Sequence, residues 1–171
     1  MLLITGPPGA GKTTVIRTVA ASLAGRRLGG FYTAEVRGAT GRTGFRLITF
    51  DGREGIIARV GAGGPDRVGK YGVNVGVVDE LAATALRVSR AVEVYLVDEI
   101  GKMECLSAVF VTAMRALLDS GQPVVATVGQ RGGGFVAEVK QRGDAELWRI
   151  TRENRDALPD RVVAWLGARD A

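Results

Sequence analysis

Short apolar runs alternate with helix-like segments along the whole chain. Apolar runs predict buried strands at residues 1–5, 30–36, 92–97, 123–128 and 146–150. Between them, apolar residues recur at helical spacing and predict helices over residues 14–23, 76–91, 106–117, 134–142 and 158–166. This alternation is typical of an α/β fold with a mainly parallel five-stranded core sheet and helices on both faces.

The pattern changes after the second predicted strand. Two further strand-like runs follow, at residues 45–50 and 56–60, and the turn signals 38–41 and Asp51-Gly52 precede them. Short turns of this kind connect antiparallel neighbours. We therefore predict an antiparallel meander, inserted at about residues 30–60.

Residues 61–75 contain five glycines and Pro65, and this composition predicts a loop. Loops of such length in compact domains are often functional. Lys70, Tyr71 and Asn74 can reach a ligand from it, and a merely solvated connection fits the composition equally well.

The segment Gly6–Thr13 fits the phosphate-loop pattern G-x-x-x-x-G-K-[ST], between a predicted strand and a predicted helix. Its backbone N–H groups can converge on a triphosphate at a helix N-terminus. Lys12 is expected to bridge the β- and γ-phosphates, and the Thr13 hydroxyl to hold Mg²⁺. The candidate nucleotide-binding residues here are Gly6, Pro7, Pro8, Gly9, Ala10, Gly11, Lys12, Thr13 and Thr14.

A second motif, Asp98-Glu99, ends the apolar run 92–97. An apolar strand that delivers a carboxylate to the magnesium site is the Walker-B arrangement, so Asp98 is the second expected Mg²⁺ ligand. Glu99 can orient a water molecule and accept its proton for attack on the γ-phosphate. The structural alternative is a glutamate at a helix N-terminus, stabilised by the helix dipole.

Charge that develops in the transition state calls for a cation besides Lys12. Arg37, Lys102 and Arg131 each follow a predicted core strand, and we expect Arg37 or Lys102 to serve within the same chain. Thr127, at the end of the fourth strand, can hydrogen-bond the attacking water or the γ-phosphate, or cap the following turn.

Composition narrows the chemistry further. The chain has no histidine and one cysteine, Cys105, which excludes an internal disulfide, a multi-cysteine zinc site and imidazole bases. The net charge is +5, but the basic residues are dispersed, which argues against a nucleic-acid partner. The sequence has no apolar run long enough for a membrane span and no targeting signal. We expect one cytoplasmic domain over residues 1–171, acting as a monomer.

With both motifs in place, the chain resembles the nucleoside-triphosphatase family first described in thermophiles, whose human member is called cancer-related nucleoside-triphosphatase. The resemblance implies slow, Mg²⁺-dependent hydrolysis of ATP, GTP, CTP and other nucleoside triphosphates, on a core related to RecA and AAA+ ATPases. It also implies a strand between the phosphate-loop and Walker-B strands. The matching segments are 6–14, 30–37, 68–73, 97–104 and 151–155. Candidate nucleotide contacts in them include Asp98, Glu99, Ile100, Gly101, Lys102 and Asn154.

Two other functions share the phosphate loop. A nucleotide or small-molecule kinase needs an Arg-rich lid and an acceptor pocket, and the inserted loops carry scattered arginines without a compact lid motif. A nucleotide-dependent binding switch that acts on nucleic acid needs a second domain or a nucleic-acid groove, and the sequence indicates neither. Hydrolysis with little preference among bases is therefore the predicted function.

Overall fold

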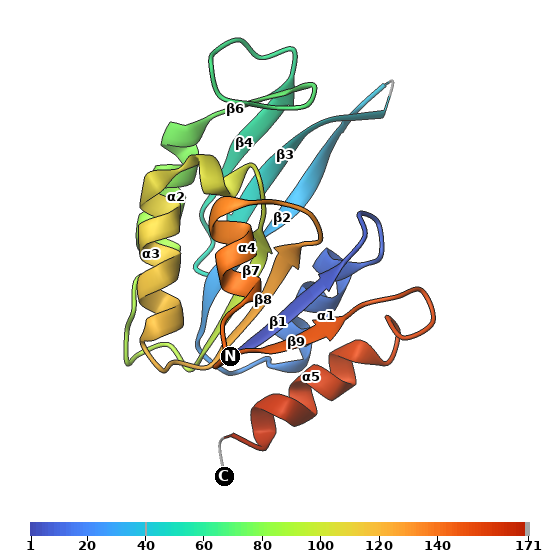
Figure 1. Cartoon of the computed structure of the whole chain (residues 1–171), viewed down its shortest axis with the longest axis vertical. Helices are drawn as coiled ribbons and strands as arrows, with labels where there is room; N and C mark the ends of the chain where they lie inside the picture. The colour runs from blue at the N-terminus through green and yellow to red at the C-terminus, as the bar shows by residue number, and fades with distance from the viewer. Residues whose placement is uncertain (40, 170–171) are drawn as a thin grey trace.

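The computed structural model describes residues 1–39 and 41–169 and builds them around one nine-stranded sheet (Figure 1). The strand order in the sheet is β5-β6-β4-β3-β2-β7-β8-β1-β9. The strands are β1 (Leu2–Gly6), β2 (Leu28–Gly38), β3 (Gly41–Thr49), β4 (Glu54–Val60), β5 (Arg67–Val68), β6 (Tyr71–Val73), β7 (Val94–Ile100), β8 (Val124–Gly129) and β9 (Glu146–Arg149). The helices are α1 (Lys12–Ser22), α2 (Val75–Ala85), α3 (Ala108–Asp119), α4 (Gly134–Lys140) and α5 (Leu158–Gly167), with a 3₁₀ turn η1 (Glu104–Leu106).

One half of the sheet is parallel and confirms the predicted five-stranded core. Strands β2, β7, β8, β1 and β9 are neighbours in that order and all pair in parallel. The predicted strand between the phosphate-loop strand β1 and the Asp98 strand β7 is β8. Because parallel strands end at the same edge of a sheet, the loops that follow β1, β7 and β8 meet there.

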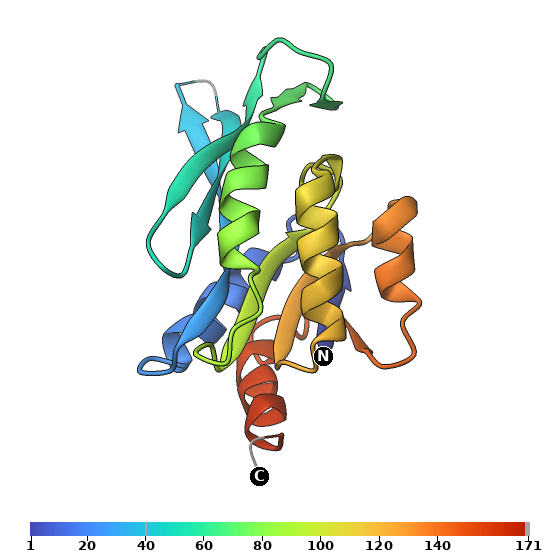
Figure 2. The same ribbon diagram turned by 90° about the vertical axis from the view of Figure 1, so that its left-hand side faces the viewer.

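Helices cover both faces of this half, as the strand alternation requires. Leu2 and Ile4 of β1 pack with α1 and α5, whereas Leu3 points to the opposite face, toward α2, α3 and α4. Figure 2 shows α2, α3 and α4 side by side over that second face. No helix of residues 1–39 and 41–169 is long and apolar enough to span a membrane.

The antiparallel half corrects one prediction. Strands β2, β3 and β4 form the predicted meander, and the turn at 38–41 falls partly on Thr40, which lies outside the described residues. Residues 61–75 are not wholly a loop, because β5 and β6 form a small hairpin that pairs with β4. The glycine-rich flanks hide this pairing, which depends on Tyr71 and Val73 packing against Ala58 of β4.

Two predicted helices have different bounds in the structure: one ends earlier than predicted and the other begins and ends two residues later. The predicted helix 76–91 ends at Ala85, and Val88 is 43% exposed. The buried hydroxyl of Tyr95 accepts from the Ser89 N–H at 2.9 Å and donates to the Arg87 carbonyl at 2.6 Å, which holds the chain in a turn. Leu106 lies in η1 instead of the predicted helix, since Ser107 caps α3 by accepting from the Phe110 N–H.

Gly30 lets β2 approach β7 closely. Its φ is +92°, and an ideal Cβ there would lie 2.0 Å from the Leu96 carbonyl oxygen. Gly52, in the turn before β4, has a nearly equal φ of +91°, but a Cβ there would meet no atom within 4 Å. Substitution of Gly52 would therefore introduce backbone strain alone, whereas substitution of Gly30 would introduce the same strain and a steric conflict.

We expect Gly30→Ala to destabilise the fold much more than Gly52→Ala. Backbone strain alone costs about 1–2 kcal/mol in the left-handed region, and steric conflict inside the sheet adds about 1–3 kcal/mol for Gly30→Ala. Urea denaturation of both variants and the parent chain measures the difference in the free energy of unfolding. Equal losses in the two variants would show that the β2–β7 contact can relax.

Candidate active site

The phosphate-loop segment leaves β1 and enters α1 through a turn that depends on glycine. Gly9 and Gly11 have φ values of +77° and +107°, a region that side chains disfavour. Gly6 is equally restricted, because a Cβ there would lie 2.6 Å from the Ile150 side chain. The turn thereby brings backbone N–H groups to the N-terminus of α1, where the helix dipole favours an anion.

Lys12 is the first residue of α1 and lies against this turn. Its ammonium donates to the carbonyl oxygens of Gly6 at 3.1 Å and Pro7 at 3.4 Å. It also forms an ion pair with Glu99 at 3.5 Å, with only 10% of the Lys12 side chain exposed. The first sequence motif and the second are therefore in direct contact.

The Asp98 carboxylate is 1% exposed, and among the described residues its hydrogen-bond donors are three threonine hydroxyls. Thr13 donates to Oδ2 at 2.6 Å, Thr33 donates to the same oxygen at 3.1 Å, and Thr127 donates to Oδ1 at 2.7 Å. These donors come from α1, β2 and β8. Thr127 thus donates to Asp98 instead of capping a turn. The contact of Thr33 with Asp98 was not predicted, because Thr33 lies inside the second predicted strand and carries no local sign of a role at the site.

Oxygen atoms suited to a hard cation are already paired here. The Thr13 hydroxyl and the Asp98 carboxylate face each other at 2.6 Å, and both are ligand types that Mg²⁺ prefers. Among the described residues, no group of three or more His, Cys, Asp or Glu is arranged to hold a metal. Mg²⁺ commonly needs only one or two protein ligands, because phosphates and water complete its shell.

Glu99 and Asp98 both lie inside β7, so the strand continues past the predicted end to Ile100. Glu99 is partly buried beside Lys12. Burial raises the pKa of the Glu99 carboxyl, Lys12 opposes that shift, and the Asp98 charge adds to it. A carboxyl with a raised pKa is a better proton acceptor once ionised, which suits a general base.

A third carboxyl, Glu104, is buried beside the first two. It is 6% exposed, and burial, with Glu99 and Asp98 adding to it, raises the pKa of Glu104 to about 8. A Cβ on Gly101 would lie 2.8 Å from Glu99 Oε1 and 2.9 Å from Glu104 Oε2, so these carboxyls flank the same glycine. In the sequence, Glu104 stands out only as part of the matching segment 97–104, because no pattern among its neighbours indicates that it is buried.

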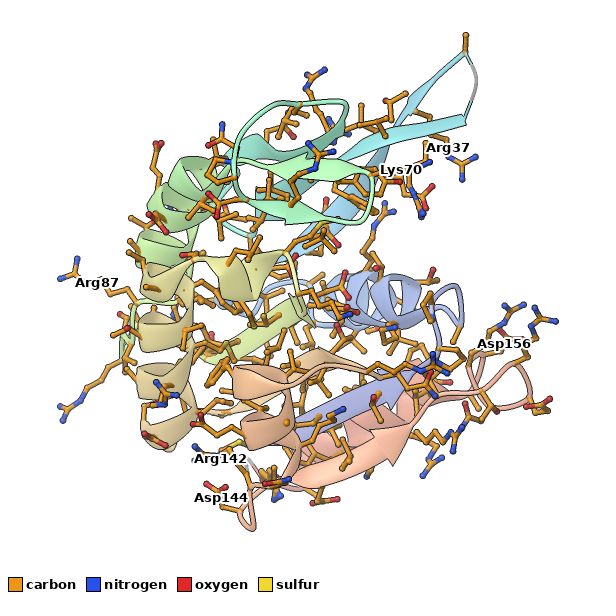
Figure 3. All side chains as sticks on the ribbon, turned by 45° about the horizontal axis from the view of Figure 1, so that its top comes forward. Arg37, Lys70, Arg87, Arg142, Asp144 and Asp156 are labelled. Carbon is orange, nitrogen blue, oxygen red and sulfur yellow. The ribbon has the colours of Figure 1, made fainter. Side chains whose placement is uncertain are left out.

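The candidate cations differ in position. Arg37 lies within β2 and not beyond its end, is 75% exposed, and donates to Glu35 at 2.8 Å and 3.1 Å. Figure 3 shows it pointing outward at the margin of the molecule. Lys102 and Arg131 follow β7 and β8 as predicted, and both are exposed. Arg37 is therefore engaged with Glu35 at the surface, and the choice between the candidate cations stays a prediction.

The segment after β9 lies beside the phosphate loop. A Cβ on Gly11 would lie 3.6 Å from Arg155 Cδ, which brings this segment to the loop. Asn154 is engaged within the segment, because its amide accepts from the Thr151 N–H at 2.8 Å and donates to the Arg149 carbonyl at 2.9 Å. Its predicted nucleotide contact stays a prediction.

The remaining candidates fall into two groups. Exposed ones are Pro7, Pro8, Gly9 and Thr14, whereas buried ones are Ala10, Ile100 and Gly101. The Ile100 side chain belongs to the hydrophobic core, so a nucleotide can meet only its backbone.

Three residues of the segment 61–75 were open candidates for a ligand. Tyr71 is 7% exposed, and its hydroxyl accepts from Arg42 at 2.9 Å. Asn74 caps α2 by accepting from the Val77 N–H at 3.2 Å. Lys70 remains exposed (Figure 3). Tyr71 and Asn74 thus have structural partners.

Comparison with known proteins agrees with this geometry. A family model described as NTPase matches residues 1–163. A nucleoside-triphosphatase THEP1 from Thermotoga maritima is 40% identical over 166 residues, 96% of this chain and 94% of that protein. The crystal structure of THEP1 from Aquifex aeolicus superimposes with a TM-score of 0.88 at 39% identity, covering 97% of this chain and 99% of that one. The solution structure of a human cancer-related nucleoside triphosphatase gives 0.78 at 38% identity, covering 95% of both chains.

We expect Glu104 to make stability depend on pH. Its pKa is about 8 in the folded chain against the ordinary 4.5, so folding retains a proton that the unfolded chain releases between these values. The stabilisation is complete below the ordinary pKa and is lost as the pH rises through the folded one. Glu104→Gln should gain on the parent chain by up to about 1.4 kcal/mol per pH unit over that window.

Urea denaturation at a series of pH values measures this gain. Glu80→Gln, at an exposed position of α2, is the matched control and should follow the parent chain at every pH. Parallel profiles for the parent chain and Glu104→Gln would show that Glu104 is ionised in the folded state.

Proposed function

The chain belongs to the NTPase family and hydrolyses nucleoside triphosphates, and we propose that it does so with Mg²⁺, slowly and with little preference among bases. The observation that carries the proposal is the contact between the two motifs. Lys12 and Thr13 of the phosphate loop reach Glu99 and Asp98 of β7, respectively. All four side chains lie at the carboxyl edge of the parallel strands, where such sheets bind ligands.

The phosphate loop is proposed to hold the triphosphate. Backbone N–H groups at the start of α1 and the Lys12 ammonium offer positive charge to the β- and γ-phosphates. Thr13 and Asp98 are the residues that would hold Mg²⁺, which when bound neutralises charge on the phosphate oxygens. Asp98 is held by Thr33 and Thr127, so its orientation does not depend on the ligand.

Glu99 is proposed as the general base. Its carboxylate accepts a proton from a water molecule, the water oxygen bonds to the γ-phosphorus, and the bond between that phosphorus and the β–γ bridging oxygen breaks. The products are the nucleoside diphosphate and phosphate. The ion pair with Lys12 fixes Glu99 next to the phosphate loop at 3.5 Å.

Broad base tolerance follows from where binding energy is concentrated. The proposed contacts are with phosphates and Mg²⁺, which every nucleoside triphosphate shares. The segment 151–155 is the proposed neighbour of the base, since Arg155 lies beside Gly11. We propose that ATP, GTP and CTP differ by about tenfold or less in affinity. A single domain, a monomer and the absence of a nucleic-acid partner stay predictions.

We expect Glu99→Gln to slow hydrolysis by about 10²–10⁴-fold while it keeps nucleotide and Mg²⁺ binding, because it removes the proton acceptor and retains the shape. Release of phosphate from ATP, GTP and CTP, without any added acceptor, measures turnover, and calorimetry measures binding. Lys12→Ala is the contrasting variant and should lose binding together with turnover. Loss of binding in Glu99→Gln would instead assign Glu99 to the architecture of the site.

Lys102 is proposed as the cation that stabilises the transition state from within the chain. It follows Glu99 by three residues, whereas Arg37 is bound to Glu35. A well-placed cation raises the rate about 10³–10⁵-fold. Because Lys102 is exposed, we propose that it contributes less than this, in keeping with the proposed slow hydrolysis. We expect Lys102→Ala to lower kcat by about tenfold or more, and Arg37→Ala to change it by less than about twofold.

Specific activity of the parent chain over a hundredfold range of enzyme concentration completes this test. A cation in the same chain predicts constant specific activity at saturating nucleotide. Activity that rises steeply with concentration would assign the cation to a second subunit.

A further inference from the structure

A basic pocket lies beside the proposed nucleotide site, at the same edge of the sheet. It has a cavity volume of about 660 Å³ and is lined by the β5–β6 hairpin, the segment from Lys102 through η1, α3, and the start of α4. Figure 2 shows the hairpin at the upper end of the molecule, above α3 and α4. The lining excludes residues 6–14 and includes Lys102, so the pocket adjoins the proposed nucleotide site without containing the phosphate loop.

The pocket carries positive charge that acidic side chains match only in part. Arg67, Lys102 and Arg115 line it, and among the described residues no Asp or Glu does. Within the described part of the chain, Arg67 donates to two backbone carbonyls, those of Ala62 at 2.9 Å and Lys70 at 3.4 Å, and to no carboxylate. Arg115 shares its charge with Glu138, which it contacts at 2.7 Å from outside the lining. An anion with more than one negative charge fits this balance.

Part of the lining is apolar. Val68, Leu106 and Phe135 face the same space, and Leu106 is 39% exposed although it is a large hydrophobic residue. The guanidinium of Arg115 lies 5.0 Å from the centre of the Phe135 ring, so charge and aromatic surface adjoin. Inorganic phosphate alone would leave this apolar surface uncovered.

We propose that the basic pocket binds a small organic phosphate, a phosphate monoester attached to an apolar or aromatic body of about nucleoside size. A monoester carries between one and two negative charges at neutral pH, and the volume falls within the range of small-molecule sites. The site also gives a role to the first two residues of the segment 68–73. Val68 and Gly69 of that segment line the pocket, on the hairpin that pairs with β4.

The test uses AMP as the probe, with the phosphate loop filled by saturating ADP and Mg²⁺. Backbone amide NMR shifts report the location, and the glycines at 69, 132, 133 and 134 are markers within the lining. Adenosine and inorganic phosphate are the two half-probes. Arg67→Ala is the pocket variant, and Arg87→Ala, whose side chain points into solvent elsewhere (Figure 3), is the matched control.

We expect AMP to shift the amide signals of the marker glycines saturably. Each half-probe should bind at least about tenfold more weakly than AMP. Arg67→Ala should weaken AMP binding by about tenfold, with an otherwise unchanged spectrum, and Arg87→Ala should leave it unchanged. Shifts confined to residues 6–14, no saturation, or equal binding by Arg67→Ala would overturn the proposal. Failure of ADP itself to shift residues 6–14 would contradict the proposed function and leave the pocket result intact.

Discussion

The buried carboxylate of Asp98 is the interaction on which the rest of the site depends. Taking an ionised carboxylate out of water costs several kcal/mol unless donors replace the lost solvent. Three threonine hydroxyls do so here, from the phosphate-loop helix and from the strands on either side of β7. Because hydrogen bonds to a charged group each contribute about 1.5–3 kcal/mol, the carboxylate holds these four elements in one arrangement before any ligand arrives.

Glu99 extends this negative charge, and Glu104 adds a buried carboxyl that keeps its proton at neutral pH. Lys12 contacts Glu99, while Glu104 is buried with both other carboxylates nearby and has a strongly raised pKa. Groups of this kind cluster at functional sites, where the cost in stability is offset by a useful proton affinity. The positive charge of the phosphate loop and the negative charge of β7 are therefore in contact beside the proposed substrate position.

The inserted meander divides the surface around this edge. Strand β2 belongs to both halves of the sheet: it contributes Thr33 to the Asp98 cluster and carries Arg37 outward on its far end. The same insertion brings the β5–β6 hairpin back over the segment that follows β7. This antiparallel extension thus holds Arg37 beside Glu35 at the surface and supplies one wall of the basic pocket.

Sequence alone was sufficient for the parallel core, the phosphate loop and the Asp98-Glu99 pair, because each is encoded by neighbouring residues: an apolar run, a glycine spacing, or a carboxylate at a strand end. Tertiary structure decided what depends on distant partners. Thr33 lies at the site through its hydrogen bond to Asp98, and Glu104 through burial beside the strand β7. Helix α2 ends before its apolar periodicity does, because Tyr95 holds the residues that follow in a turn. Strand β6 depends on pairing with β4. A local sequence pattern indicates which face of a strand or helix is buried, whereas the order of the strands in the sheet decides which residues pack against that face.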